Sequence, residues 1–191
     1  MPDTGQRSPT SSTGFGFNGG AAHDENTATG ASTFGIGSAK THTLGGFAGA
    51  DLPAGAAVDG VKVFINARHF VFISYEAATF ESVKLSLNDG SAYSSNILSS
   101  NQNVTATAVE YTFGGDSETW GLTWSGFTDI SDLKVEFISN AADGSGNHFF
   151  ITQEVFVQVY YTEGGVAATT GPIKIGAGSK FHISSGKFTI K

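Results

Sequence analysis

Alternation of apolar and polar residues is the clearest pattern in this chain. In residues 61–68, VKVFINAR, the apolar residues at positions 61, 63, 65 and 67 fall on one face, and Lys62, Asn66 and Arg68 fall on the other. A period of two is typical of a β-strand with one buried face. The pattern therefore predicts a strand here that buries Val61, Val63, Ile65 and Ala67.

Four further stretches have the same character. FESVKLSLNDG (80–90) places apolar residues at 80, 83, 85 and 87 and ends in an Asn-Asp-Gly turn signal. NVTATAVEYTF (103–113) and LKVEFIS (133–139) indicate two more strands, and FFITQEVFVQVYYT (149–162) indicates the longest. In this last stretch we expect one face to hold Ile151, Val155, Val157, Val159 and Tyr161, with Thr152, Glu154 and Gln158 mostly on the other.

Five or more strands separated by Gly, Asn, Asp and Ser, without a helical period, predict an all-β fold, either an antiparallel β-sandwich or a jelly roll. We expect the sandwich over 46–162. Residues 1–45 are rich in Gly, Ser, Thr and Asn and predict a flexible or extended arm, because such a segment buries too little surface to offset its ordering entropy. Residues 163–191 predict a linker and a short β-rich tail.

The tail holds three β-prone pieces at 173–175, 180–183 and 187–190, joined by Gly-rich turns. Each piece is too short to fold alone. We expect these pieces to pair with the sandwich or with another subunit.

Composition narrows the classes of function. Ten basic and 17 acidic residues give a net charge of −7, which argues against nucleic-acid binding, because phosphates require a basic face. The absence of cysteine excludes disulfides, thiolate chemistry and zinc sites built on cysteine. No secretory signal and no run of apolar residues long enough for a membrane span stand out. We therefore expect a protein made in the cytoplasm, with no membrane partner.

Sequence motifs of catalysis and metal binding are not evident. There is no GxSxG elbow and no P-loop, and His23, His42, His69, His148 and His182 share no metal-binding spacing. The carboxylates are dispersed and indicate no facing pair for glycoside hydrolysis. DGSGN (143–147) lacks the later glutamate of a calcium loop, and Asp116 with Glu118 is read as a solvated pair. We expect no enzyme activity, no cofactor and no metal.

The two tryptophans of the chain lie in TFGGDSETWGLTWSGFTD, residues 112–129. Trp120 and Trp124 are separated by an even number of residues, so in a continuous strand both would lie on one face. Burial statistics for large aromatic residues favour packing in the core or at its edge. The alternative is an exposed platform in which Trp120, Trp124 and Tyr93 stack on a sugar ring.

Three stretches of the chain stand together as a recurrent pattern: GADLPAGAAVDGVKVFINAR (49–68), YTFGGDSETWGLTWSGFTDI (111–130) and EVFVQVYYT (154–162). They resemble a β-sandwich module found in virion structural proteins of tailed bacteriophages. The resemblance covers roughly residues 45–162, with a departure at Glu118-Thr119, where the family pattern has Asp and an apolar residue. It implies a non-enzymatic virion component in the head, neck or tail.

Of these positions we favour a capsid decoration (cement) protein that stabilises the phage head. The implied partners are the major capsid protein or other virion subunits, and the implied assembly is a homo-oligomer, with a trimer favoured. Apolar residues spaced along a polar arm and tail often mark contacts. The contacts expected here are Phe15, Phe17, Phe34, Ile36, Phe181, Ile183, Phe188 and Ile190. The alternative function is a receptor- or carbohydrate-binding module associated with the tail or a fibre.

Overall fold

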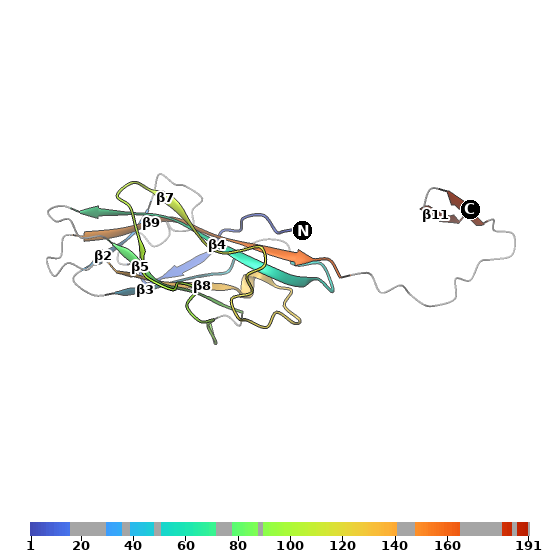
Figure 1. Ribbon diagram of the computed structural model, residues 1–191, viewed down its shortest axis with the longest axis horizontal. Helices are drawn as coiled ribbons and strands as arrows, with labels where there is room; N and C mark the ends of the chain where they lie inside the picture. Colours follow the sequence, from blue (N-terminus) through green and yellow to red (C-terminus); the bar gives the residue numbers. More distant parts are fainter. Residues whose placement is uncertain are drawn as a thin grey trace.

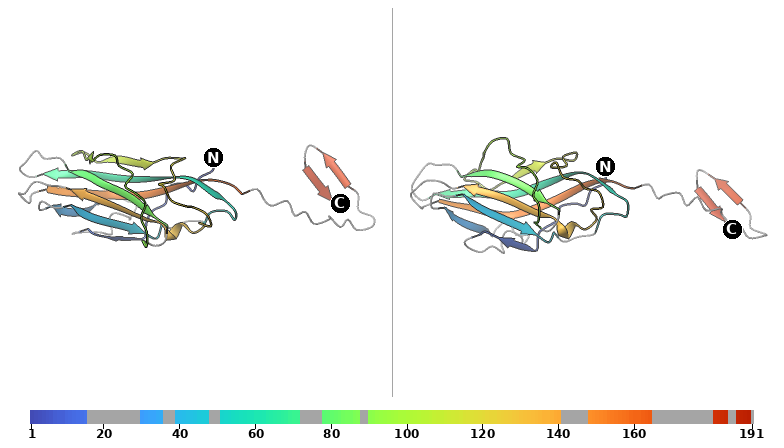
Figure 2. Two further views of the ribbon diagram at one scale, coloured as in Figure 1. Left: turned by 60° about the horizontal axis from the view of Figure 1, so that its bottom comes forward. Right: turned by 90° about the horizontal axis from the view of Figure 1, so that it is seen from below.

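The computed structural model describes residues 1–15, 30–35, 39–47, 51–71, 78–87, 90–140, 148–164, 181–184 and 187–190. Two antiparallel sheets pack face to face (Figure 1, Figure 2). This confirms the predicted all-β antiparallel sandwich. The described residues contain no helix of the length and apolarity that a membrane span requires.

One sheet has the strand order β1-β3-β8-β5-β6 and the other the order β2-β9-β4-β7. A single 3₁₀ turn, η2, precedes β8 among the described residues. The elements are β1 (Ser11–Thr13), β2 (Ala31–Gly35), β3 (Lys40–Gly45), β4 (Ala57–Val71), β5 (Thr79–Ser86), β6 (Gln102–Asn103), β7 (Val109–Gly114), η2 (Ile130–Asp132), β8 (Lys134–Asn140), β9 (His148–Thr162), β10 (Phe181–Ser184) and β11 (Lys187–Ile190).

The core lies between the sheets and follows the alternation in the sequence. In β4 the fully buried residues are Val61, Val63, Ile65 and Ala67. Val135 and Phe137 of β8 are fully buried too, as is Leu133, which precedes β8. Phe80 sits at the centre of an aromatic cluster, with its ring 5.0 Å from Phe150 and 5.3 Å from Phe113, both edge-on. Burying each such side chain contributes about 1.5–3 kcal/mol, so this cluster is a main source of stability.

A bulge in β9 changes the face on which its first residues lie. Asn66 of β4 pairs with Glu154, but the next residue, Ala67, pairs with Thr152, so Gln153 is an extra residue in β9. One extra residue reverses the alternation on that side of the bulge. Thr152 is therefore buried and Ile151 is half-exposed. The predicted placement of these two residues was wrong.

The N-terminal segment differs from the predicted arm over 1–45. Its described residues supply β1 and β3 to one sheet and β2 to the other. Asp3 and Arg7 also form bridges to β9, beside Tyr160 and Val157. A segment poor in apolar residues can be ordered in this way because the backbone groups at the edges of β8 and β9 need hydrogen-bond partners, which any sequence can supply.

The tail has β-strands at two of the three predicted pieces. β10 and β11 pair with each other as a two-stranded ribbon and with no other described strand. Pairing with another subunit stays a prediction. The predicted piece at 173–175 lies outside the described residues. We refer to residues 181–190 as the C-terminal ribbon.

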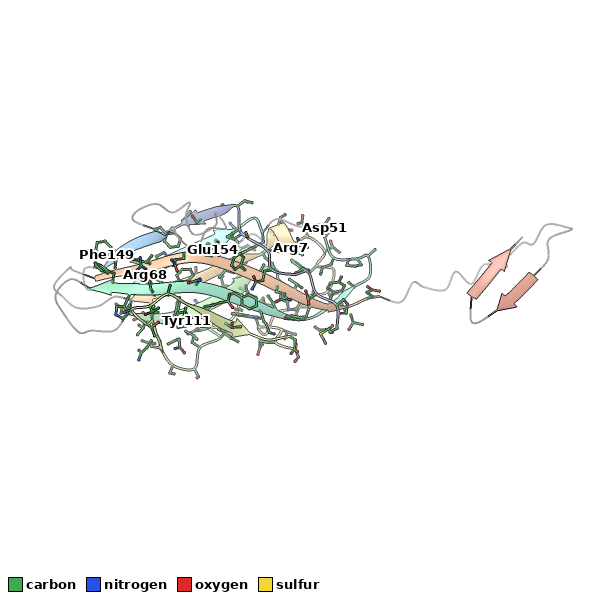
Figure 3. The ribbon with its side chains drawn as sticks, turned by 90° about the horizontal axis from the view of Figure 1, so that it is seen from above. Arg7, Asp51, Arg68, Tyr111, Phe149 and Glu154 are labelled. Carbon is green, nitrogen blue, oxygen red and sulfur yellow. The ribbon has the colours of Figure 1, made fainter. Side chains whose placement is uncertain are left out.

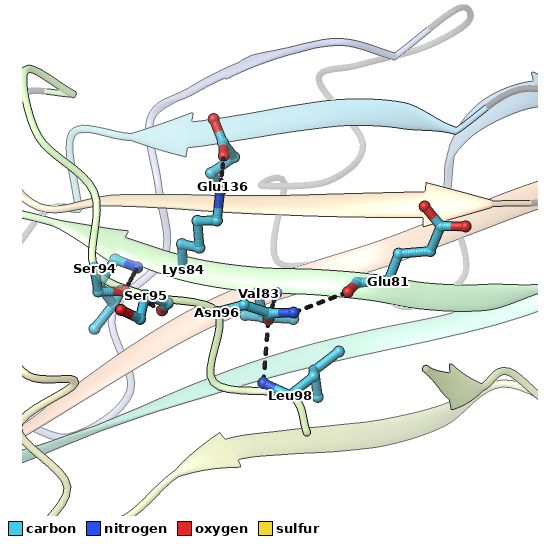
Figure 4. Close-up of polar contacts among 9 residues, drawn as sticks. Glu81, Val83, Lys84, Ser94, Ser95, Asn96, Leu98 and Glu136 are labelled. Atoms are coloured by element: carbon cyan, nitrogen blue, oxygen red, sulfur yellow. Dashed lines mark hydrogen bonds and ion pairs between the residues drawn. The ribbon is translucent and has the colours of Figure 1, made fainter. Parts of the chain in front are cut away.

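The edge of β5 is covered by residues 93–103, an irregular segment that ends in the short strand β6. Ser94 N–H donates to the Leu85 carbonyl at 2.7 Å, and Ile97 N–H donates to the Val83 carbonyl at 3.1 Å. The N–H groups of Val83 and Leu85 donate to side chains of the same segment: Val83 N–H to Asn96 Oδ1 at 3.0 Å and Leu85 N–H to Ser94 Oγ at 3.0 Å. Figure 4 shows this arrangement beside the Lys84–Glu136 ion pair. The segment thus blocks strand addition at this edge.

Candidate ligand-binding site

The segment between β7 and β8 is fixed to β4 through the backbone of Val61. The Val61 carbonyl accepts from Gly115 N–H at 3.2 Å and from Trp120 Nε1–H at 2.9 Å, while Val61 N–H donates to the Glu118 carbonyl at 3.0 Å. Gly114 has a φ of 78°, and a Cβ at this position would lie 2.3 Å from the Val61 carbonyl oxygen. Only glycine fits here, so Gly114 is required for the turn to reach β4.

Trp120 and Trp124 are both buried by this arrangement. Trp120 is 3 % exposed and has a φ of 59°, and its N–H donates to the Glu118 carboxylate at 2.8 Å. Trp124 is 8 % exposed, and its Nε1–H donates to the Thr119 carbonyl at 3.0 Å. Both side chains pack in the core, as the burial argument favoured, and neither indole offers an open ring face for stacking. The side chain of Glu118 is engaged within the turn.

Trp124 supports Phe127, which lies further along the same segment. The two rings meet edge-on at 5.1 Å with an interplanar angle of 88°. A turn with Gly126 at a φ of 78° brings Phe127 N–H to the Trp124 carbonyl at 3.1 Å. The Thr128 carbonyl accepts from Leu52 N–H at 3.0 Å. Phe127 is therefore fixed by Trp124 through its ring and its backbone, and the next residue is anchored to Leu52.

Phe127 forms part of the wall of a hollow between this segment and the end of β5. The hollow has a volume of about 340 Å³ and is lined by Leu87, Thr123, Ser125, Gly126, Phe127, Thr128, Asp129 and Asp132. Ligand sites typically measure roughly 300–1,000 Å³ and combine an apolar wall with a few polar groups. The size and lining of this hollow fit a small polar ligand.

The two carboxylates give the hollow a negative charge, and none of the described residues that line it is basic. Asp129 caps η2: its Oδ1 accepts from Ser131 Oγ at 2.6 Å and from Ser131 N–H at 2.8 Å. These two hydrogen bonds hold the pKa of Asp129 below its usual 3.8, and the bond from the Ser131 hydroxyl has the larger effect. No described residue hydrogen-bonds the carboxylate of Asp132, so this group can accept hydrogen bonds from a ligand.

Tyr93 is near the hollow but does not line it. It is half-buried and forms a backbone bridge with Ser86, the residue that precedes Leu87. Sequence reasoning missed Phe127, Asp129 and Asp132. The Ser-Gly-Phe turn and the Asp-x-Ser cap could have indicated a tightly folded segment, but nothing local in the sequence places Leu87 opposite it.

The predicted partner contacts are distributed over the chain. Phe15 is half-buried and packs within this chain, 4.4 Å from the ring of His42 and 6.3 Å from that of Phe137. Phe34 lies in β2 opposite Phe149. Phe17 and Ile36 lie outside the described residues. The C-terminal ribbon contains Phe181, Ile183, Phe188 and Ile190.

Within the described ranges, no three His, Asp or Glu side chains come together in a way that could hold a metal ion. The DGSGN sequence at 143–147 lies outside these ranges. Asp116 is exposed and accepts from Ser117 Oγ at 3.1 Å.

Comparisons with known proteins gave distant structural similarity only. No family model matches the chain, and no curated protein matches it. The similar solved structures include the CBM32 of AlyQ in complex with 4,5-unsaturated mannuronic acid, at 15 % identity and a TM-score of 0.44, covering 80 % of this chain and 96 % of that one. Chitosan-binding module 1 of a chitosanase/glucanase from Paenibacillus sp. IK-5 gives 13 % identity and 0.44, covering 82 % and 98 %. The CBM22-1 xylan-binding domain of Paenibacillus barcinonensis Xyn10C gives 10 % and 0.34, covering 83 % and 94 %. Similarity at this level assigns no ligand to the chain.

Proposed function

We propose that this protein is a non-catalytic module that binds a saccharide in the hollow beside Phe127. The observation that carries the proposal is the lining itself, in which three hydroxyl side chains and two carboxylates surround one aromatic ring. Sugar hydroxyls donate to carboxylates and exchange hydrogen bonds with Thr and Ser. The ring of Phe127 offers an apolar surface to the C–H groups of a sugar. The proposal rests on this lining and not on the distant structural similarity.

The charge of the hollow indicates which saccharides it would accept. Asp129 and Asp132 are acidic, and the lining residues that the structure describes include no basic side chain. An anionic sugar would meet like charge without compensation, which disfavours binding. Neutral sugars and cationic amino sugars therefore fit better than uronates.

The same geometry argues against hydrolysis. A general acid in a glycosidase needs a carboxyl group whose pKa is raised so that it carries a proton near neutral pH. Hydrogen bonds from Ser131 move the pKa of Asp129 in the opposite direction. Asp129 is thus suited to accept hydrogen bonds and unsuited to donate a proton.

Binding can be tested by affinity electrophoresis and calorimetry against xylan, chitosan oligosaccharides and alginate. We expect binding to a neutral or amino saccharide and none to alginate. Asp132→Asn should weaken binding about 10-fold or more, since a hydrogen bond to a charged group contributes about 1.5–3 kcal/mol. Phe127→Ala should weaken it as well.

Asp116→Asn provides a matched control, because it removes the same charge at an exposed position that does not line the hollow. This variant should bind as the original protein does. Absence of binding to every saccharide, or an equal loss in Asp132→Asn and Asp116→Asn, would contradict the proposal.

A second candidate function is a structural subunit of a phage particle that decorates the head and contacts the major capsid protein or its neighbours. The apolar composition of the C-terminal ribbon, which pairs with no described strand of the sandwich, favours an assembly role. The sequence resemblance gives this function weaker support. Its opening motif (49–68) and central motif (111–130) are in contact at Val61, so the fold alone requires these residues. Immunogold labelling of particles would test this: label on heads supports it, and particles without label contradict it.

A further inference from the structure

β7 is the longest of the four strands that end the two sheets. It has six residues, against three in β1, five in β2 and two in β6. One edge of β7 pairs with Lys62–Ala67 of β4, and no described strand pairs with the other. Glu110 and Thr112 are exposed, and Val109, at 39 %, is one of three large apolar side chains exposed among the described residues. Unlike β5, this edge is open to strand addition.

The C-terminal ribbon has two unlike faces. Phe181 pairs with Ile190 and Ile183 pairs with Phe188, while His182 pairs with Thr189 and Ser184 with Lys187. Residues opposite each other in an antiparallel pair share a face, and successive residues alternate. The register therefore places two Phe and two Ile on one face of a ribbon that is marginal in water by itself. Such a ribbon needs a larger sheet to join.

The charges of the ribbon and of β7 are complementary. Residues 164–191 contain four lysines and no acidic residue, whereas residues 1–163 contain six basic and 17 acidic residues. Lys187 is the first residue of β11, and Lys180 and Lys191 adjoin the two strands of the ribbon in the sequence. Glu110 lies near the start of β7, and Asp116 and Glu118 follow its end. The opposite charges of the two segments favour contact between the ribbon and β7.

We propose that the C-terminal ribbon of one copy adds to the free edge of β7 in a second copy. Among the described strands of one chain, those of the ribbon pair only with each other. The segment from 163 to 180 separates β9 from β10 and can extend at about 3.3 Å per residue, far enough to reach a neighbouring sandwich. Main-chain hydrogen bonds at the edge would supply affinity, and the lysines would set the position.

The donor and acceptor surfaces differ, so each copy gives a ribbon and receives one. Such contacts repeat from copy to copy and close into a ring where the rotation allows it. The inference is independent of the saccharide proposal, since the hollow and β7 share no residue.

The test measures self-association of the full chain by sedimentation velocity. We expect oligomers, and we expect Glu110→Lys (edge variant) and Phe188→Asp (ribbon variant) each to lower the association constant about tenfold or more. Asp51→Lys is the charge control; Figure 3 shows Asp51 and Tyr111 of β7 on different sides of the sandwich. This control should associate normally, and all three variants should keep the melting temperature of the sandwich.

Mixing the two defective variants distinguishes this contact from other forms of association. The edge variant keeps an unchanged ribbon, and the ribbon variant keeps an unchanged β7. The ribbon of the first can therefore pair with β7 of the second, and the mixture should form heterodimers. If the contact were between two ribbons, Glu110→Lys would associate as the original protein does, and the mixture would form no heterodimers. This result would overturn the proposal. A full chain that stays monomeric at all concentrations would overturn it too.

A cross-link gives a direct readout, because the chain has no cysteine of its own. Thr112→Cys in one chain and Thr189→Cys in another should form an intermolecular disulfide on mixing under mild oxidation. Asp51→Cys mixed with Thr189→Cys should not. Equal yields from the two mixtures would contradict pairing at β7.

Discussion

At the scale of single residues, Val61 links two sequence motifs that lie far apart in the chain, the strand at 61–68 and the segment around the tryptophans. Its side chain is buried in the core, and its backbone holds Gly115, Glu118 and Trp120. The spacing of Gly60, Gly114 and Trp120 follows from this junction, since a Cβ on Gly60 would lie 2.5 Å from the Gly115 carbonyl oxygen. The motif around the tryptophans is therefore explained by packing, without a ligand.

Replacing Trp120 tests this explanation. Trp120→Ala should lower the free energy of unfolding by about 3–5 kcal/mol, because it removes a large buried ring. Trp120→Phe keeps most of the ring and loses the hydrogen bond to the Val61 carbonyl, which still accepts from Gly115, so a smaller loss of about 1–2 kcal/mol is expected. Chemical denaturation measures both. Unchanged stability in Trp120→Ala would contradict the structural role.

His42 is a second residue whose burial has a measurable consequence. Its ring packs against Phe15 at 4.4 Å and Phe137 at 4.7 Å, and its Nε2 is 2.7 Å from Ser139 Oγ. Burial away from water lowers the pKa of His42 from 6.5 to about 4. The folded protein thus resists protonation of a group that the unfolded chain protonates readily.

The sign of the pH effect follows from this difference. Above pH 6.5 His42 is neutral in both states; as the pH falls from 6.5 to about 4, the unfolded state takes up the proton first, and stability is lost. The loss due to His42 should reach about 3 kcal/mol at the low end of this window. His42→Gln should show a shallower decline over the same window. Parallel stability curves for the two proteins would contradict the assignment.

At the scale of elements, alternation predicted β4 and β8 well because these strands are regular and bury one face. It was wrong at the start of β9, where the bulge at Gln153 reverses the faces. A similar shift between Phe80 and Ser82 explains why Phe80 and Val83, three residues apart, are both buried in β5. A bulge depends on the partner strand, so a period of two in one strand cannot indicate it.

β1, β2 and β3 could not be predicted for a different reason. Their sequences, SST, ASTFG and KTHTLG, have little apolar alternation. They are ordered by backbone hydrogen bonds to β8, β9 and each other. The hollow was missed for the same reason, since Leu87 and Phe127 are brought together by the fold and not by sequence spacing.

The cover over β5 gives a prediction for an element. Asn96 accepts from Val83 N–H at 3.0 Å and Leu98 N–H at 3.1 Å and donates to the Glu81 carbonyl at 3.0 Å. Asn96→Ala should lower the free energy of unfolding by about 1–3 kcal/mol, because the backbone of β5 loses its partner. Asn101→Ala, at an exposed position in the same segment, should change it by less than about 0.5 kcal/mol. Equal values for the two variants would contradict a special role for Asn96.

At the scale of the whole molecule, charge is divided unevenly along the chain. The acidic residues all lie within 1–163, and four of the ten basic residues lie within 164–191. An acidic body with a basic tail favours contacts between copies over contacts with nucleic acid. The same acidic character in the hollow favours uncharged or cationic ligands. The two proposed contacts therefore differ in how much they depend on charge.

Salt separates these contacts in one protein. Self-association that depends on the lysines of residues 164–191 should weaken as NaCl rises from about 0.05 to 0.5 M, because the screening length falls below about 10 Å. Binding of a neutral saccharide in the hollow involves no ligand charge and should be nearly unchanged over the same range. Sedimentation and calorimetry on the same samples measure the two effects. Association that strengthens with salt would show that the apolar face of the ribbon dominates and that the acidic groups around β7 do not guide the contact.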